Sequence, residues 1–82
     1  MKEYNGHRSW NTWNVALWIN NDEGLYNLAL EDIELTKSKK TGKYRFGAAA
    51  SRFVNNVGGG KTPDGATFNR LSVKLALENL KD

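Results

Sequence analysis

The strongest constraint on the fold is a run of apolar residues at helical spacing between residues 46 and 57. One side of that run collects Phe46, Ala49, Ala50, Phe53, Val54 and Val57. Because residues at these spacings share a face, the pattern predicts an amphipathic helix of about three turns. The alanines at 48–50 would let a second helix approach closely. Asn55 and Asn56, followed by the glycines at 58–60, predict where the helix ends.

Two further segments have the same helical period. Residues 22–36 predict a helix whose inward residues are Leu25, Leu28, Ala29 and Ile33. Its acids, predicted to point largely outward, are Glu31, Asp32 and Glu34. Near the C-terminus, Ser72 is a suitable N-cap for a helix over residues 73–80. The predicted buried face of that last helix is Val73, Ala76, Leu77 and Leu80.

The segment 10–19 fits two templates. As a helix, capped by Asn11 or Thr12, it would place Trp13, Ala16 and Leu17 on one face. As a strand, it would alternate Trp13, Val15, Leu17 and Ile19 against Asn14, Ala16, Trp18 and Asn20. We favour the helix, because no clear partner strand follows in the sequence.

Together these segments predict an all-α fold, a compact single domain of three or four short helices. A chain of 82 residues can build one core, and its three Trp, three Phe and three Tyr are expected mainly to fill it. Residues 1–9 are predicted to form a flexible arm, and residues 58–65 a Gly-rich, Pro-containing loop with a turn at Thr62-Pro63-Asp64-Gly65. A homodimer that completes the core stays open beside the monomer.

Features that the sequence lacks predict the cellular compartment of the protein. The longest apolar stretch, residues 15–19, is far below the roughly 20 residues that span a bilayer. The N-terminal residues contain no apolar run of the kind found in signal peptides. The absence of cysteine fits a reducing compartment. We therefore expect a cytoplasmic protein without membrane contact.

The N-terminal third resembles a family of short uncharacterised proteins from phages, prophages and plasmids. The resemblance rests on Tyr4-Asn5-Gly6, on residues 9–19 with the core Trp-Asn-Thr-Trp-Asn-Val-Ala-Leu-Trp-Ile, and on Asn21-Asp22-Glu23. It covers residues 4–26 well and extends to Thr62-Pro63-Asp64-Gly65, but it hardly touches the middle of the chain. It implies a mobile-element accessory protein, a class that includes stoichiometric inhibitors of restriction and CRISPR nucleases. It implies no functional residues.

The sequence offers little support for catalysis. Residues 58–62, Gly-Gly-Gly-Lys-Thr, end like a phosphate-binding loop, but that motif needs a glycine where Asn55 stands, and Pro63 follows at once. The single histidine, His7, lies in the polar arm, and no cysteine can complete a zinc site. The acids suit a helix N-terminus and a solvated helix face. We expect no catalytic residue, no metal and no cofactor, and therefore no enzyme.

The best candidate contact is a basic segment in the middle of the chain. Residues 1–36 carry a net charge of −4 and residues 37–82 a net charge of +7. Within residues 37–52 no acid accompanies Lys37, Lys39, Lys40, Lys43, Arg45 and Arg52. Lysine and arginine neutralise phosphates, free helix N–H groups near Thr41 and Gly42 would add to an anion site, and Tyr44 could stack on a base. The opposing interpretation is that lysines merely keep a linker solvated.

Two functions follow as expectations. The first is a protein that binds a host protein or ribonucleoprotein complex, such as a defence nuclease, and inhibits it by occlusion. Trp18 points away from Trp13 on a helix, and an exposed indole there would anchor a protein interface. The alternative is a small nucleic-acid-binding protein that uses residues 37–52.

Overall fold

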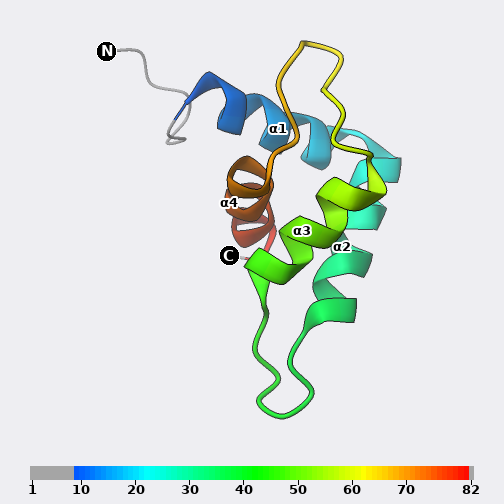
Figure 1. Ribbon diagram of the computed structural model, residues 1–82, viewed down its shortest axis with the longest axis vertical. Helices are drawn as coiled ribbons and strands as arrows, with labels where there is room; N and C mark the ends of the chain where they lie inside the picture. The colour runs from blue at the N-terminus through cyan, green and yellow to red at the C-terminus, as the bar shows by residue number, and fades with distance from the viewer. Residues whose placement is uncertain (1–8, 82) are drawn as a thin grey trace.

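The computed structural model describes residues 9–81, and within that range the protein is all-α. Its four helices are α1 Trp10–Asn21, α2 Glu23–Thr36, α3 Phe46–Asn56 and α4 Arg70–Leu80. In Figure 1, α1 crosses the upper part of the molecule, the other helices lie below it, and the turn between α2 and α3 projects at the bottom. The predicted fold class is confirmed. No helix within residues 9–81 is both long enough and apolar enough to cross a membrane.

The segment 10–19 is helical, but its cap and its buried face differ from the prediction. Ser9 is the N-cap, and its hydroxyl accepts the backbone N–H of Thr12 at 3.2 Å. Ser9 therefore caps α1 instead of forming part of a loose arm, and the rest of the predicted arm lies outside the described residues. The side chains that α1 buries are Thr12, Asn14, Val15, Ala16 and Ile19. Leu17, predicted to be inside, is 36% exposed, because the smaller and branched side chains of the opposite face let α1 pack closely on its neighbours.

α2 begins after a single non-helical residue, Asp22. The Asp22 carboxylate caps the helix by accepting the N–H of Leu25 at 3.0 Å. Ala29 and Ile33 are buried as predicted, and the two leucines of the predicted inward face pack partly against the core. The second helix is thus confirmed with the predicted face.

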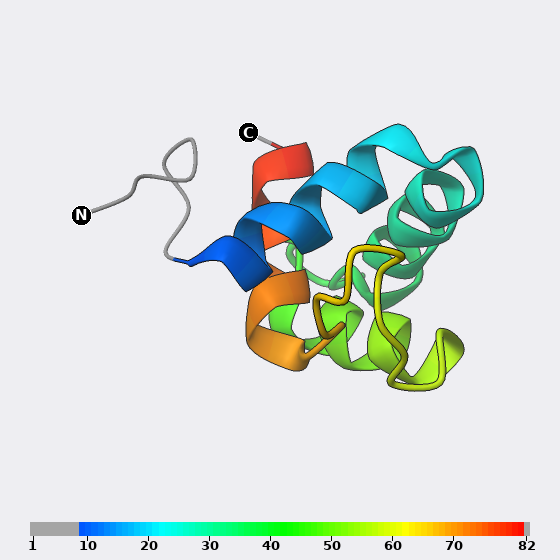
Figure 2. The same ribbon diagram turned by 90° about the horizontal axis from the view of Figure 1, so that it is seen from above.

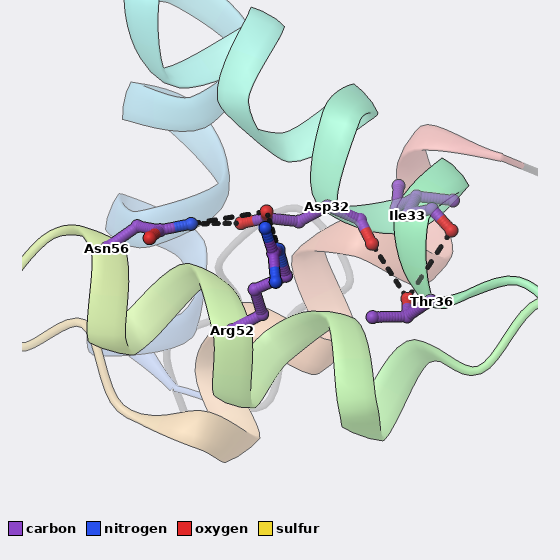
Figure 3. Close-up of polar contacts among 5 residues, drawn as sticks. All are labelled: Asp32, Ile33, Thr36, Arg52 and Asn56. Atoms are coloured by element: carbon purple, nitrogen blue, oxygen red, sulfur yellow. Dashed lines mark hydrogen bonds and ion pairs between the residues drawn. The ribbon is translucent and has the colours of Figure 1, made fainter.

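Asp32 was predicted to point outward, and this was wrong. Its side chain is fully buried, at 0% exposure, between α2 and α3. Arg52 donates from Nε to Asp32 Oδ1 at 3.0 Å, and Asn56 donates from Nδ2 to both carboxylate oxygens at 3.2 Å (Figure 3). Because Arg52 and Asn56 lie one turn apart on α3, both donors reach the same carboxylate, which satisfies a charge that burial would otherwise penalise.

α4 begins earlier than predicted and has another cap. Asn69 is the N-cap, and its Oδ1 accepts both the backbone N–H and the hydroxyl of Ser72 at 2.9 Å. Ser72, the predicted cap, therefore lies within the first turn. The predicted inward face is confirmed for Val73, Ala76 and Leu77, which are buried. α3 also agrees with its prediction, burying Ala49, Ala50 and Phe53.

The core is less aromatic than the composition indicated. Its members are Val15, Ala16, Ile19, Ala29, Ile33, Ala49, Ala50, Phe53, Ala66, Phe68, Val73, Ala76 and Leu77. Phe53 and Phe68 pack with ring centroids 5.9 Å apart. Trp10 is 39% exposed, and the other two indoles are half-buried at the rim. Five of the six core alanines lie on helices, and these small side chains let the helices pack too closely for an indole to fit between them.

Candidate functional site

The turn between α2 and α3 is closed by its own backbone rather than being an open linker. Ser38 donates its N–H to the carbonyl of Lys43 at 2.9 Å, and Gly42 donates to the carbonyl of Ser38 at 2.9 Å. Gly42 has a φ of 73°, in the left-handed region that glycine adopts without a steric penalty. The lysines of this turn are therefore carried on an ordered backbone.

Cations gather on this turn and beside it. We define the basic end as Lys37, Lys39, Lys40, Lys43, Arg45 and Lys81. A depression of about 530 Å³ opens between the end of α2 and the start of α3. It is lined by Leu35, Thr36, Lys37, Ser38, Lys39, Lys40, Arg45 and Ala48, with no acid among them. The fold thus gathers four of the predicted cations around one concave surface.

Tyr44 links the turn to the end of α4. The Nζ of Lys37 lies 5.2 Å from the centroid of the Tyr44 ring, and the Nζ of Lys81 lies 5.4 Å from it. The ring of Phe46 is 5.6 Å away. These cation–π contacts hold two ammonium groups against the ring that was predicted to stack on a base. Lys81 is a member of the basic end that sequence reasoning missed, because nothing in the local pattern places it near Tyr44.

Two parts of the predicted anion site lie elsewhere. Arg52 is in the ion pair with buried Asp32, so this cation is neutralised by a partner inside the protein. The free N–H groups of α3 are not at Thr41 and Gly42, because the helix begins at Phe46. Arg45 stands at the N-cap and makes no side-chain capping hydrogen bond, and it lines the depression. The helix N-terminus therefore borders the depression from the α3 side.

Trp18 is placed by a hydrogen bond within the protein. It is half-buried, and its Nε1–H donates to Asp64 Oδ2 at 2.9 Å. Asn14 donates from Nδ2 to the same oxygen at 2.9 Å. These two hydrogen bonds, first that of Asn14 and then that of Trp18, lower the pKa of the exposed Asp64 below its usual value of 3.8.

Side chains of α1 also form hydrogen bonds with residues on both sides of Asp64. Thr62 donates its hydroxyl to Asn14 Oδ1 at 2.6 Å, and the N–H of Ala66 donates to the Thr62 hydroxyl at 3.0 Å. Asn11 donates to the carbonyl of Thr67 at 3.0 Å and accepts the N–H of Thr67 at 2.7 Å. Figure 2 shows this connection beside α1. We define the polar clasp as Asn11, Asn14, Trp18, Thr62, Asp64 and Thr67.

The clasp joins two segments that lie far apart in the sequence. Asn11, Asn14 and Trp18 come from the tryptophan-rich motif, and they bind the turn that contains Thr62 and Asp64. The two segments that carried the resemblance are thus in contact through side chains. Their role here is to fix the connection between α3 and α4.

The three glycines at 58–60 follow α3, and the first two of them cap its C-terminal end. Gly58 and Gly59 have φ values of 70° and 66°, and their N–H groups donate to the carbonyls of Asn55 and Val54 at 3.1 and 3.0 Å. Successive left-handed residues after the last helical turn satisfy carbonyls that the helix leaves free. This segment follows a helix, whereas a phosphate-binding loop follows a strand.

The described part of the chain offers no cluster of metal-binding side chains. Residues 9–81 hold no group of three or more acidic or histidine side chains close enough to bind one ion. His7, the histidine considered from the sequence, lies outside the described residues.

The chain belongs to a family of unknown function (DUF7249), which it matches over residues 1–82. No curated protein and no solved structure matches the chain. Family membership therefore adds no activity to the geometry described above.

Proposed function

We propose that this protein works by binding, and that the basic end is its contact with a host protein or ribonucleoprotein complex. The observation that carries the proposal is the set of cations without acidic partners. Within residues 9–81 the ion pairs are Arg52–Asp32 and Lys74–Glu78, and neither involves the basic end. Unpaired cations on an ordered turn keep their charge available for a partner.

The shape of the turn supports this assignment. It projects from the helices at the bottom of the molecule in Figure 1, so that a partner can approach it without meeting α1 or the clasp. Leu35, at 58% exposure, adds apolar surface to the cationic depression. Positive charge speeds encounter with an acidic partner, and the apolar side chain adds contact area once the two meet.

The kind of complex is proposed from the resemblance. Short proteins of phages, prophages and plasmids include inhibitors that occupy a surface of a host defence nuclease. A small domain with one charged contact suits occlusion by one copy per target, of the anti-CRISPR or anti-restriction type. We propose this role for the chain, in the cytoplasm of a bacterial host.

Two matched variants test the contact. The turn variant, Lys39→Gln/Lys40→Gln, removes two charges from the basic end. The control variant, Lys61→Gln/Lys74→Gln, removes two charges elsewhere, that of exposed Lys61 and that of half-buried Lys74, which is in the surface ion pair with Glu78 at 3.9 Å. Such surface pairs stabilise by only about 0.2–1 kcal/mol. Both variants therefore lower the net charge equally and are expected to fold.

The tagged wild-type protein and both variants are incubated with untreated and with nuclease-treated lysate of a bacterial host. The expected result is capture of a defined complex by the wild type and the control, at about one copy per target. The turn variant should bind roughly tenfold more weakly for each lysine that makes a charge-assisted contact. Equal capture by all three proteins would remove the basic end as the contact, and no capture by any would remove the proposed function.

A further inference from the structure

We infer that the depression at the basic end binds the phosphate groups of a single-stranded nucleic acid, as part of the complex that the protein contacts. The inference rests on the proposed function, because it names the chemistry that the basic end recognises. Four cations, Lys37, Lys39, Lys40 and Arg45, line the depression. A single strand carries one negative charge on each phosphate, so a row of cations on a fixed turn faces a row of charges of the opposite sign.

The cations, rather than the hydroxyls, supply the recognition. The Thr36 hydroxyl donates back to the carbonyl of Asp32 at 2.7 Å, as Figure 3 shows. The Ser38 hydroxyl accepts the N–H of Thr41 at 3.4 Å. The hydrogen of the Thr36 hydroxyl is thus used within the chain, whereas the Ser38 hydroxyl keeps its hydrogen and can add one neutral donor. Ammonium and guanidinium groups are the charged donors to a phosphate, and the first turn of α3 beside Arg45 adds its positive end.

The acids nearby determine on which side a strand lies. A second hollow on this turn is lined by Glu34 together with Leu35, Lys37, Ser38, Lys39 and Gly42. Glu31 and Glu34 are exposed on α2 and would repel phosphates. The depression bordered by Arg45 and Ala48 has no acid in its lining. A strand would thus follow the α3 side of the turn and avoid the outer face of α2.

A nucleic acid fits this surface better than the acidic face of a protein. Carboxylates on a protein surface are interspersed with other groups, whereas a strand presents an unbroken row of phosphates. Leu35 is 58% exposed at the edge of the depression and offers apolar contact to a base or a sugar. The fold also brings Lys81 to Tyr44 beside the turn, which extends the cationic surface beyond the depression.

The test is fluorescence anisotropy with labelled single-stranded DNA and RNA oligonucleotides of mixed sequence. If four phosphates are contacted, the logarithm of the binding constant should fall against the logarithm of the salt concentration with a slope of about −3. Between about 50 and 200 mM salt the wild type should lose affinity roughly 50-fold. The turn variant should have a slope shallower by about 1.4, and the control variant should keep the wild-type slope.

Several outcomes would overturn the inference. These are the absence of salt-dependent binding by the wild type, equal slopes for the turn and control variants, and displacement by inorganic phosphate as readily as by unlabelled strand. Matched melting curves for the three proteins show that any loss comes from the contact rather than from the fold. If oligonucleotides do not bind but lysate capture still depends on the turn, the partner is an acidic protein surface and the proposed function stands. If oligonucleotides bind through the turn but no defined complex is captured from lysate with or without nuclease treatment, the proposed function fails, and only the binding of phosphates by the depression stands.

Discussion

The polar clasp and the basic end use their polar side chains in opposite ways. In the clasp, Asn14 and Trp18 of α1 bind Asp64, and Thr62 binds Asn14, across about half the length of the chain. At the basic end, the backbone closes the turn and the charged groups of Lys39 and Lys40 have no acidic partner within residues 9–81. The clasp thus contributes to the fold, whereas the basic end leaves its charge for another molecule.

Arg52 gives the most decisive test of this comparison. It lies in the basic segment of the sequence, but in the structure it pairs with a buried carboxylate and stabilises the fold. Arg52→Ala leaves the fully buried Asp32 carboxylate with Asn56 as its remaining side-chain donor. Removing one partner of a buried ion pair costs about 3–5 kcal/mol. We expect a loss of about 3 kcal/mol in the free energy of unfolding, at the low end because the Arg52 side chain is 49% exposed and water can enter.

Urea denaturation of the purified variant measures this loss. Arg70→Ala is the matched control, since the Arg70 Nε donates to the Ser51 hydroxyl at 3.0 Å rather than to a buried charge. The control should lose about 1 kcal/mol or less. A stability of Arg52→Ala equal to that of the control would place Arg52 with the free cations. Because Arg52 is paired with Asp32, the salt dependence of oligonucleotide binding by Arg52→Ala should match that of the wild type.

The clasp is tested at its buried centre, Asn14, which is 1% exposed. Asn14→Ala removes the acceptor of the Thr62 hydroxyl and one of the two side-chain donors to Asp64. A buried hydroxyl without its partner costs about 1–3 kcal/mol, so we expect a destabilisation of about 2 kcal/mol. Asn27→Ala, at an exposed position of α2, should change the free energy of unfolding by no more than about 0.5 kcal/mol. Similar urea midpoints for the two variants would mean that the clasp does not contribute to the stability of the fold.

Asp64 makes the clasp sensitive to acid. Its pKa is lowered in the folded state by the hydrogen bonds of Asn14 and Trp18, so folding favours the ionised carboxylate. This contribution is complete above the usual pKa of 3.8 and is lost as the pH falls below that value and through the lower folded pKa. The melting temperature of the wild type should exceed that of Asp64→Asn near neutral pH, and the difference should shrink below about pH 4. A difference that stays constant from pH 6 to about pH 2 would show that the ionised form is not favoured.

The fold was largely predictable because short-range periodicity determines it. The faces of α2, α3 and α4 follow from apolar spacing, and the structure confirms them. The buried face of α1 did not follow, because nearly every side of that helix carries an apolar or neutral residue and only tertiary packing selects one.

The candidate site was harder to predict, because the contacts of its charged side chains join residues that lie far apart in the sequence. The basic turn was visible as a run of lysines, and four of its predicted cations line one depression, whereas Lys43 does not. The pairing of Arg52 with Asp32 joins two helices, and the approach of Lys81 to Tyr44 joins the end of α4 to the turn. Neither contact leaves a local pattern. Residue type alone therefore could not separate the cations that stabilise the fold from those that remain available.

The smallest effect on stability is expected at the basic end. Lys39 and Lys40 are exposed, and neither forms an ion pair within the described range. The turn variant Lys39→Gln/Lys40→Gln should therefore unfold within about 0.5 kcal/mol of the wild type, because surface changes away from specific contacts are usually this small. Removing two like charges from a crowded turn can even raise stability slightly, most visibly at low salt, where repulsion is least screened. A loss above about 1 kcal/mol in urea denaturation would show that these lysines hold the turn together, and the contrast with the clasp would disappear.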